Sequence, residues 1–333
     1  MMLTLLKPWM SAKARTHSTT RSSSRRAVWP ERAPTTSRSL TPANSKEIID
    51  IINQCKSKQS KDHNDTDMIL IQRIIHEIVV PITHKCNLSL EAGTFPAQMK
   101  IAKVVPIFKS VDRQEISNYR PISILPQFSK ILEKVFSARL DRFIEKHKLL
   151  IENQHGFRNK RCTALALMDV VEEIIDNIDN KLIPVGVFID LKKAFDTMDH
   201  QILIQKLEKN GIRGVPLNWV KSYLSNREQY VQLGNFSSRR RYITCGVPQG
   251  SILGPKLFLL YINNLCHISA KFKFTLFADD TTIVCSGKDL QLLIAEISTE
   301  LNKLKQWVDD NKLSVNISKT KMIIFGKRLK TFK

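Results

Sequence analysis

The sequence predicts an α+β protein, in which short apolar strands alternate with amphipathic helices. After Pro126, apolar residues recur at helical spacing over 128–144. A short run of β-forming residues at 185–189 ends at Asp190, and two apolar segments, 272–277 and 281–284, are separated by only three residues. Strands and helices mixed in this order are typical of an α+β fold.

The first half of the chain is predicted to be mainly helical. Isoleucine and leucine residues over 69–79 predict an amphipathic helix that ends at Pro81. The helix over 128–144 follows, and a third is predicted over 163–178. The face of the second helix opposite its apolar stripe carries Lys130, Lys134, Arg139 and Arg142. These cations suit a phosphate backbone, but a solvated charged face is the commoner role for such residues.

From residue 185 onward, strands and helices alternate. Their boundaries follow from β-forming runs, helical periodicity and turn residues such as Gly234-Asn235. The predicted elements are a strand at 185–189, helices at 201–207 and 217–224, strands at 229–233 and 241–245, a helix at 251–265, strands at 272–277 and 281–284, a helix at 290–308 and a strand at 322–325.

Composition and charge indicate a globular protein with a polyanionic partner. The chain has 333 residues, of which 42% are hydrophobic. It carries 52 Lys and Arg against 31 Asp and Glu, a net charge of +21, and such an excess favours nucleic acid through counterion release. No apolar run could span a membrane, so no membrane partner is expected. The six cysteines lack zinc-finger spacing, and we predict reduced thiols, no zinc, and an intracellular location in the nucleus or cytoplasm.

Residues 1–46 differ from the rest of the chain. They are rich in Ser, Thr, Arg and Pro, and Glu31 is their only acidic residue. Because the segment has too little apolar surface to bury, we expect a disordered basic tail. An acid-poor start rich in Arg and Ser also resembles an organelle transit peptide, but we favour the disordered arm. We expect a helical N-terminal extension over 47–100 and the main domain over 101–333.

Three aspartates are the strongest candidates for chemistry. Asp279 and Asp280 lie at the expected tip of a hairpin, and Asp190 ends a separate apolar strand. One Asp in a turn is ordinary turn chemistry, but two carboxylates about 4 Å apart repel by roughly 4 kcal/mol at an effective dielectric of about 20. If the strands are neighbours, the three carboxylates converge, and such oxygen ligands suit Mg²⁺. Two such ions would support an in-line phosphoryl transfer.

The order of several sequence blocks is more specific than the aspartates alone. Asp190 is followed by Gly-Val-Pro-Gln-Gly-Ser at 246–251 and then by Phe-Ala-Asp-Asp at 277–280. The chain resembles the reverse transcriptases of non-LTR (LINE-type, jockey-like) retrotransposons. The other blocks that carry this resemblance are 118–123 with 130–133, 154–158, 188–196, and 313–316 with 319–321.

The resemblance implies a right-hand polymerase with fingers and a palm, the palm being an antiparallel sheet packed on helices. The implied metal ligands are the catalytic carboxylates of Asp190, Asp279 and Asp280. The backbone carbonyl of Leu191 is a further implied ligand. The implied cofactors are two Mg²⁺ ions, which Mn²⁺ could replace. Lys319 is the expected proton donor to departing pyrophosphate; Lys321 is its rival, and a surface role is the plain alternative.

The resemblance also implies a nucleotide site. Phe195, five residues after the first metal ligand, takes the position that faces the sugar in this family, where a bulky ring excludes a 2′-hydroxyl. A core role for Phe195 is compatible with this. Arg158, whose planar fork suits phosphate, is expected to grip the triphosphate, and Gln249 to line the pocket beside the templating base pair. Lys193 and Ala194 belong to the same nucleotide-binding set.

The implied reaction adds deoxynucleotide triphosphates to a DNA primer on an RNA template. Arg239, Arg240 and Arg241 form a cationic run that would contact template or primer phosphates, and a solvated loop is equally compatible. Two features depart from the family: no endonuclease domain is visible, and the chain stops shortly after Phe325. We therefore expect a truncated chain without a thumb. The alternative function is a catalytically inactive, nucleic-acid-binding relic of such an element.

Other reverse transcriptases, of group II introns or of the telomerase type, would keep this chemistry. The block at 118–123 and the amino-acid sequence of 313–321 favour the retrotransposon class. No feature of the sequence favours a purely structural interaction protein.

Overall fold

The computed structural model describes residues 40–109 and 112–326, which form two compact units. The first, here called the four-stranded unit, comprises residues 151–194 and 262–326 of the described chain. The second, the five-stranded unit, comprises the rest. Neither unit is continuous in sequence, because the chain passes from one to the other three times.

The four-stranded unit is built on an antiparallel sheet with the strand order β7-β8-β3-β9. The strands are β3 (Ile183–Ile189), β7 (Lys273–Phe277), β8 (Asp280–Gly287) and β9 (Lys321–Ile324). All four predicted strands of this region are confirmed, with boundaries shifted by at most three residues. The interior strand β3 buries most of its side chains, in agreement with its unbroken apolar run.

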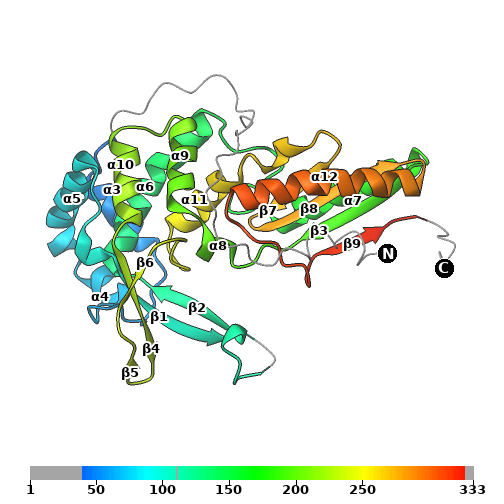
Figure 1. Ribbon diagram of the computed structural model, residues 1–333. Helices are drawn as coiled ribbons and strands as arrows, with labels where there is room; N and C mark the ends of the chain where they lie inside the picture. The colour runs from blue at the N-terminus through cyan, green and yellow to red at the C-terminus, as the bar shows by residue number, and fades with distance from the viewer. Residues whose placement is uncertain (1–39, 110–111, 327–333) are drawn as a thin grey trace, which may run out of the picture. The chain divides into compact units, whose positions relative to one another are not determined.

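Two long helices, α7 (Thr163–Asp179) and α12 (Leu290–Asp310), pack against this sheet (Figure 1). The helix α12 begins after Asp289, whose side chain accepts hydrogen bonds from the backbone N–H groups of Gln291 and Leu292. The apolar face of α12 supplies the buried Leu293, Ile297, Leu301 and Leu304. A short 3-10 turn, η3 (Leu265–Ile268), precedes β7.

The five-stranded unit contains a mixed sheet with the order β2-β1-β4-β5, to which β6 adds beside β4. Its strands are β1 (Ile101–Phe108), β2 (Tyr119–Ile124), β4 (Arg227–Leu233), β5 (Phe236–Ser237) and β6 (Arg241–Ile243). The β1–β4 pair is parallel and the other pairs are antiparallel. The β1–β2 hairpin was not predicted. Each strand contains a proline, and Pro106 and Pro121 pair with each other, which removes the usual strand signal.

Helices make up the rest of the five-stranded unit. They are α3 (Ser45–Asn53), α4 (Met68–Arg73), α5 (Ile75–Ala92), α6 (Gln127–Lys146), α9 (His200–Lys209), α10 (Val215–Leu224) and α11 (Leu253–Ile262), with the turns η1 (Ala97–Met99) and η2 (Ile116–Asn118). The short helix α8 (Ala194–Thr197) lies where the chain enters this unit from the other. The predicted helices beginning near residues 128, 201 and 217 are confirmed as α6, α9 and α10.

The predicted end of a helix at Pro81 is wrong. The break comes earlier, at Ile74, whose φ of −104° and ψ of 15° separate α4 from α5. The helix α5 then runs through Pro81 to Gly93, which ends it with a left-handed φ of 62°. A proline inside a helix costs about 3 kcal/mol. Burial of Val79, Cys86 and Leu90 against the rest of the unit offsets this cost.

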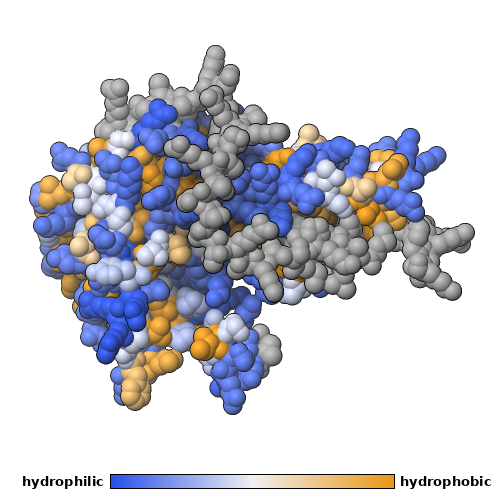
Figure 2. Space-filling model, in the orientation of Figure 1, coloured by the Kyte–Doolittle hydropathy of each residue, from blue (hydrophilic) through white to orange (hydrophobic). Residues whose placement is uncertain are grey.

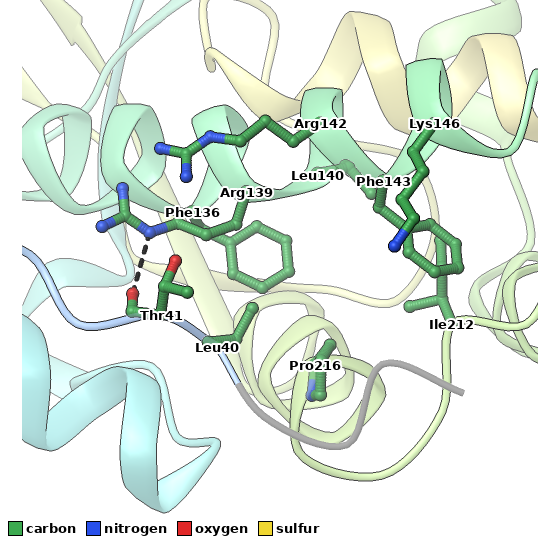
Figure 3. Close-up of a pocket in the computed structure, with 10 residues that line it drawn as sticks. All are labelled: Leu40, Thr41, Phe136, Arg139, Leu140, Arg142, Phe143, Lys146, Ile212 and Pro216. Carbon is green, nitrogen blue, oxygen red and sulfur yellow. Dashed lines mark hydrogen bonds between the residues drawn. The ribbon is translucent and has the colours of Figure 1, made fainter. Parts of the chain in front are cut away.

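Buried polar contacts fasten the N-terminal extension to α6. Asp62, only 1% exposed, accepts a hydrogen bond at 2.7 Å from the backbone N–H of Gln127, the first residue of α6. Arg139 of α6 forms an ion pair with Glu47 of α3. Its guanidinium also donates to the backbone carbonyl of Thr41 at 3.0 Å (Figure 3). The prediction that Arg139 lies on a solvated or phosphate-facing surface is therefore wrong, because this side of α6 is covered by α3.

The described chain begins inside the segment that was predicted as a disordered tail. Residues 1–39 of that tail lie outside the described residues. Asn44 accepts a hydrogen bond from the N–H of Glu47 and caps α3, which begins at Ser45. The ordered extension therefore starts a few residues before the predicted boundary.

A cavity of about 290 Å³ lies beside Arg139 in the five-stranded unit (Figure 3). Its walls are mainly apolar and come from Leu40, Phe136, Leu140, Phe143, Ile212 and Pro216. Arg142 and Lys146 also line it, and no carboxylate does so in the described part of the chain. This cavity therefore lacks the ligands of a metal site.

Membrane-spanning helices and the state of the cysteines were also considered in the sequence. No helix within residues 40–109 and 112–326 combines the length and the apolar character needed to cross a membrane. All six cysteines fall in the described residues, and each is a free thiol.

Candidate active site

Asp279 and Asp280 lie at a tight turn between β7 and β8. Phe277 pairs with Asp280, so Ala278 and Asp279 alone form the loop, and the predicted hairpin is confirmed. Ala278 has a left-handed φ of 56°, which costs a residue with a side chain roughly 1–2 kcal/mol. The turn therefore needs support from its surroundings.

The block 154–158 provides that support. Gln154 Oε1 accepts a hydrogen bond from the backbone N–H of Ala278 at 3.0 Å. His155 N donates to Leu276 O at 2.8 Å, so the segment runs along β7. Gly156 approaches so closely that a Cβ atom there would lie 2.2 Å from Ala278 N. In the structure, this block belongs to the four-stranded unit and holds the aspartate turn.

The strand register brings Asp190 to the same end of the sheet. In the antiparallel β3–β8 ladder, Ile189 lies opposite Thr281. Asp190 follows Ile189 and Asp280 precedes Thr281, so the two aspartates face each other one step beyond the ladder. The strands that carry the three predicted carboxylates are therefore neighbours.

The segment 314–316 extends the opposite edge of β3. Lys192 N donates to Ser314 O, and Asn316 N donates to Asp190 O, each at 2.7 Å. Leu191 and Val315 form the bridge between these two bonds. In this pattern the C=O of Leu191 points away from 314–316, toward the side of β3 on which β8 runs. That direction suits the metal-facing carbonyl implied by the resemblance.

Asn316 also contacts the side chain of Asp190. Its Nδ2 donates to Asp190 Oδ2 at 2.7 Å. A hydrogen bond to an ionised carboxylate is shorter and stronger than one between neutral groups. Asn316 therefore fixes the orientation of Asp190 through both its backbone and its side chain.

The carboxylates act on one another electrostatically. Burial raises the pKa of Asp279 above its usual value of 3.8, and the negative charges of Asp280 and Asp190 raise it further. Burial and the charge of Asp190 also raise the pKa of Asp280, which the positive charge of Lys319 partly lowers. The charge of Lys319 therefore acts on Asp280, and the role of Lys319 as a proton donor stays a prediction.

This donor set fits a hard divalent cation. Its members are carboxylates and a backbone carbonyl, the oxygen ligands that Mg²⁺ prefers. A cation among them would relieve the repulsion that, together with burial, raises the pKa values of Asp279 and Asp280. Across the described residues, no three His, Cys, Asp or Glu side chains are already gathered as a metal-ligand cluster. The strand register nevertheless places the three carboxylates at one end of the sheet.

Without divalent metal, the substitution Asp279→Asn is expected to stabilise the fold at neutral pH. A raised pKa means that the folded state holds the proton more tightly than the unfolded state. The stabilising contribution of the protonated group is complete below 3.8 and is lost as the pH rises through the raised value. At pH 7 the asparagine of Asp279→Asn removes a negative charge that its neighbours repel, so the free energy of unfolding should rise. The expected rise is at most about 1 kcal/mol, since Asp279 is partly exposed and solvent screens its charge.

Thermal unfolding in EDTA measures this effect. The variant should melt above the wild type at pH 7, and the difference should shrink as the pH falls toward 3.8. Added Mg²⁺ should stabilise the wild type more than the variant. A wild type that melts higher than Asp279→Asn in EDTA at pH 7 would contradict the electrostatic account.

Phe195 lies in the five-stranded unit, within α8. Its ring packs on Phe258 of α11, with ring centroids 4.6 Å apart and planes inclined by 33°. Phe258 is fully buried, whereas Phe195 is only partly buried. The Phe195 ring is thus held on one side by Phe258 and remains partly accessible. This arrangement suits both the core role and the predicted contact with a sugar.

Gln249 lies in the loop before α11, which is joined to the segment 195–198. Val247 N donates to Phe195 O at 2.9 Å, and Gly246 N donates to Met198 O at 2.7 Å. Gln249 Nε2 donates to both carboxylate oxygens of Asp196, at 2.9 and 3.1 Å. Ser123 N of β2 donates to Gln249 O at 2.8 Å.

A cavity of about 340 Å³ opens beside Gln249, within the five-stranded unit. Its lining consists of Pro121, Ser123, Asp196, Gln229, Tyr242, Ile243, Thr244, Cys245, Val247, Pro248 and Gln249. The predicted pocket residue Gln249 thus lines a real cavity. The contact between Gln249 and Asp196 was not predicted.

The other predicted nucleotide-binding residues lie in the four-stranded unit. Arg158 Nη1 donates to the backbone carbonyls of Ile151 at 2.7 Å and Gln154 at 3.2 Å, so part of its guanidinium closes its own loop. Lys193 is exposed and has a φ of 45°, and Ala194 is buried at the start of α8. The geometry of these residues does not by itself assign a ligand to them.

Arg239 and Arg240 lie between β5 and β6, Arg241 begins β6, and all three are exposed. Arg240 Nη2 lies 3.0 Å from His63 Nε2, and its Nη1 lies 3.6 Å from Glu228. Figure 2 shows an apolar patch at the tip of the β4–β5 hairpin, where Leu233 and Phe236 are 59% and 82% exposed. Cations and an exposed aromatic ring therefore occur along one hairpin.

Two contacts of predicted site residues were not foreseen from the sequence. Asn316 and Asp190 are 126 residues apart, and Gln249 and Asp196 are 53 residues apart. Asp196 directly follows Phe195 in sequence, and Asn316 lies in the last of the sequence blocks. That placement was the only available signal, and it does not identify the partner of either residue.

Carboxylates on neighbouring antiparallel strands, with a backbone carbonyl directed to the same side, define a site suited to metal-assisted phosphoryl transfer. The family model for "Reverse transcriptase (RNA-dependent DNA polymerase)" matches residues 109–331, well over half of the chain. The chain therefore belongs to the reverse transcriptase family, whose members generally use divalent metal ions. The expected family is confirmed, together with its mixed α/β fold and antiparallel sheet.

Curated relatives from Drosophila melanogaster agree with this assignment. The chain is 27% identical to the probable RNA-directed DNA polymerase from transposon X-element, over 88% of this chain and 33% of that protein. It is 29% identical to the RNA-directed DNA polymerase from mobile element jockey, over 73% of this chain and 27% of that protein. It is 30% identical to the probable RNA-directed DNA polymerase from transposon BS, over 84% of this chain and 32% of that protein. The chain thus spans about a third of the length of these relatives.

Proposed function

We propose that this chain is the fingers and palm core of an RNA-directed DNA polymerase from a non-LTR retrotransposon. The observation that carries the proposal is the β3–β8 register, which sets Asp190 opposite Asp280 at the turn that holds Asp279. The relatives from transposon X-element and mobile element jockey bear the names of such polymerases.

The proposed reaction joins a deoxynucleotide to the 3′-hydroxyl of a primer and releases pyrophosphate. Two Mg²⁺ ions, or Mn²⁺ in their place, would activate the attacking hydroxyl and neutralise the leaving group. Asp190, Asp279, Asp280 and the carbonyl of Leu191 would hold them. Lys319, whose charge already acts on Asp280, would give a proton to the departing pyrophosphate.

The four-stranded unit fits the palm, and the β1–β2 hairpin of the five-stranded unit fits the fingers. Residues 47–100 would form an N-terminal helical extension of the 101–333 polymerase domain, and 1–46 a basic tail. Phe195 would exclude a ribose 2′-hydroxyl, and Gln249 would contact the incoming nucleotide. Arg158 would contact its triphosphate through the N–H groups that do not serve the 151–158 loop.

The proposed partners are an RNA template, a DNA primer and deoxynucleotide triphosphates, in the nucleus or cytoplasm. The net charge of +21 supports a polyanionic partner. Arg239, Arg240 and Arg241, on the hairpin that also exposes Phe236, would hold the template or primer strand. Cations track the phosphates of a strand while aromatic rings stack on its bases.

A primer-extension assay tests the proposed function. The full chain is incubated with poly(rA)/oligo(dT), Mg²⁺ and dTTP, beside the matched variant Asp279→Ala. Incorporation by the wild type that is lost in Asp279→Ala supports the polymerase. Binding of the duplex without incorporation by either chain would overturn it in favour of an inactive nucleic-acid-binding relic.

A further inference from the structure

Asp196 is the one carboxylate on the lining of the cavity beside Gln249, as far as the described chain forms that lining. It is partly buried, and it directly follows Phe195. Both of its oxygens accept hydrogen bonds from Gln249 Nε2, at 2.9 and 3.1 Å. None of the roles assigned above uses this side chain.

The chemistry of this pair fixes which way the Gln249 amide points. An ionised carboxylate only accepts hydrogen bonds, whereas a glutamine amide carries an NH₂ donor and a carbonyl acceptor. The NH₂ group must therefore face Asp196, and Oε1 must face away from it. Within the described residues, Gln249 Oε1 accepts no hydrogen bond from the protein, so it is available to a molecule in the cavity.

The backbone around Asp196 is held as firmly as the side-chain contact. A Cβ atom on Gly246 would lie 2.5 Å from Asp196 O, and Gly246 has a left-handed φ of 74°, so only glycine allows this approach. Cys245 Sγ also donates to Asp196 O, at 3.3 Å. His200 Nε2 lies 2.7 Å from Gly246 O on the other side of the loop. These contacts fix the backbone that carries the Asp196 side chain.

We propose that Asp196 is a positioning residue that fixes the Gln249 amide so that its carbonyl oxygen meets the bound nucleotide. This inference rests on the proposed polymerase function. Asp196 acts through Gln249 and does not itself touch the nucleotide. It prevents the amide from turning its NH₂ donor toward the ligand, and it removes the rotamer freedom that Gln249 would otherwise lose on binding.

A double-mutant cycle tests the inference in the full chain. Asp196→Ala and Gln249→Ala should each raise the KM for dTTP roughly tenfold while kcat changes by less than about twofold, because a binding contact is lost. The double variant should be no worse than either single variant, since both remove one arrangement. Asp196→Asn, which can accept or donate, should fall between the wild type and Asp196→Ala. Glu145→Gln, at an exposed site of α6 in the same unit, serves as the control.

Additive effects of the two alanine substitutions would overturn the inference, and so would a loss of kcat with an unchanged KM. A second readout does not depend on catalysis. In a chain labelled with ¹⁵N-glutamine, the side-chain NH₂ signals of Gln249 are identified by their loss in Gln249→Ala. They should shift and exchange faster with water in Asp196→Ala. Unchanged signals would refute the contact.

The proposed polymerase function and the positioning role of Asp196 can be tested separately. If the wild type incorporates no dTTP, the proposed function fails, and the equilibrium affinity for dTTP replaces KM in the same cycle. A tenfold weaker affinity in both single variants and in the double variant would still support the role of Asp196, and equal affinity in all four chains would overturn it.

Discussion

Replacing Asp190 with asparagine is expected to lower deoxynucleotide incorporation by at least about a thousandfold. Asp190 lies opposite Asp280 in the β3–β8 register, and the carbonyl of the next residue, Leu191, is directed to the same side. A carboxylate at this position would neutralise the metal ions that bind the attacking and leaving oxygens. Asparagine keeps the shape of the side chain and removes the charge, so the loss reports on chemistry.

Primer extension at saturating template and nucleotide measures this loss. Asn316 Nδ2 donates to Asp190 in the wild type, and the asparagine of Asp190→Asn can accept the same bond through its amide oxygen, so the fold should be retained. Asp309→Asn, at an exposed position of α12 in the same unit, is the matched control and should keep full activity. Activity of Asp190→Asn within about tenfold of the wild type would remove Asp190 from the proposed metal site.

Replacing Phe195 with valine is expected to raise the use of ribonucleotides relative to deoxynucleotides by roughly a hundredfold. The Phe195 ring is held from behind by the buried ring of Phe258, so it cannot retreat from a bulkier sugar without disturbing α11. Valine removes most of the obstructing ring. A 2′-hydroxyl could then enter, while the fit of the deoxyribose should change little.

The measurement is the ratio of kcat/KM for UTP and dTTP on poly(rA)/oligo(dT). Phe143→Leu, on α6 in the same unit, shortens another partly buried phenylalanine and should leave the ratio unchanged. Because Phe195 packs on Phe258, the thermal stability of Phe195→Val should be measured alongside. A folded Phe195→Val chain with an unchanged ratio would reduce Phe195 to a core residue.

Periodicity and turn residues predicted the strands and helices of the four-stranded unit but not the register of its sheet. The strand at 185–189 and the hairpin around 278–280 are local patterns, so they could be recognised in the sequence. The pairing of Ile189 with Thr281 is a long-range property, and only that pairing brings Asp190 to Asp280. The convergence of the carboxylates was therefore a conditional hypothesis until the sheet order was known.

The errors have a common cause in tertiary contacts. The β1–β2 hairpin contains paired prolines, and proline is a strong signal against a strand. Arg139 has the spacing of a solvated residue, but its partner Glu47 lies 92 residues earlier. A local pattern shows that a cation is present and leaves its partner undetermined.

The fit between Gly156 and Ala278 limits what can be inferred from an intact set of catalytic residues. The aspartate turn leaves no space for one methyl group at Gly156, since a Cβ atom would lie 2.2 Å from Ala278 N. A Gly156→Ala copy would retain all three aspartates and still displace the turn that carries two of them. Under the proposed function, a copy that keeps the aspartates but lacks glycine at position 156 is therefore expected to lose synthesis.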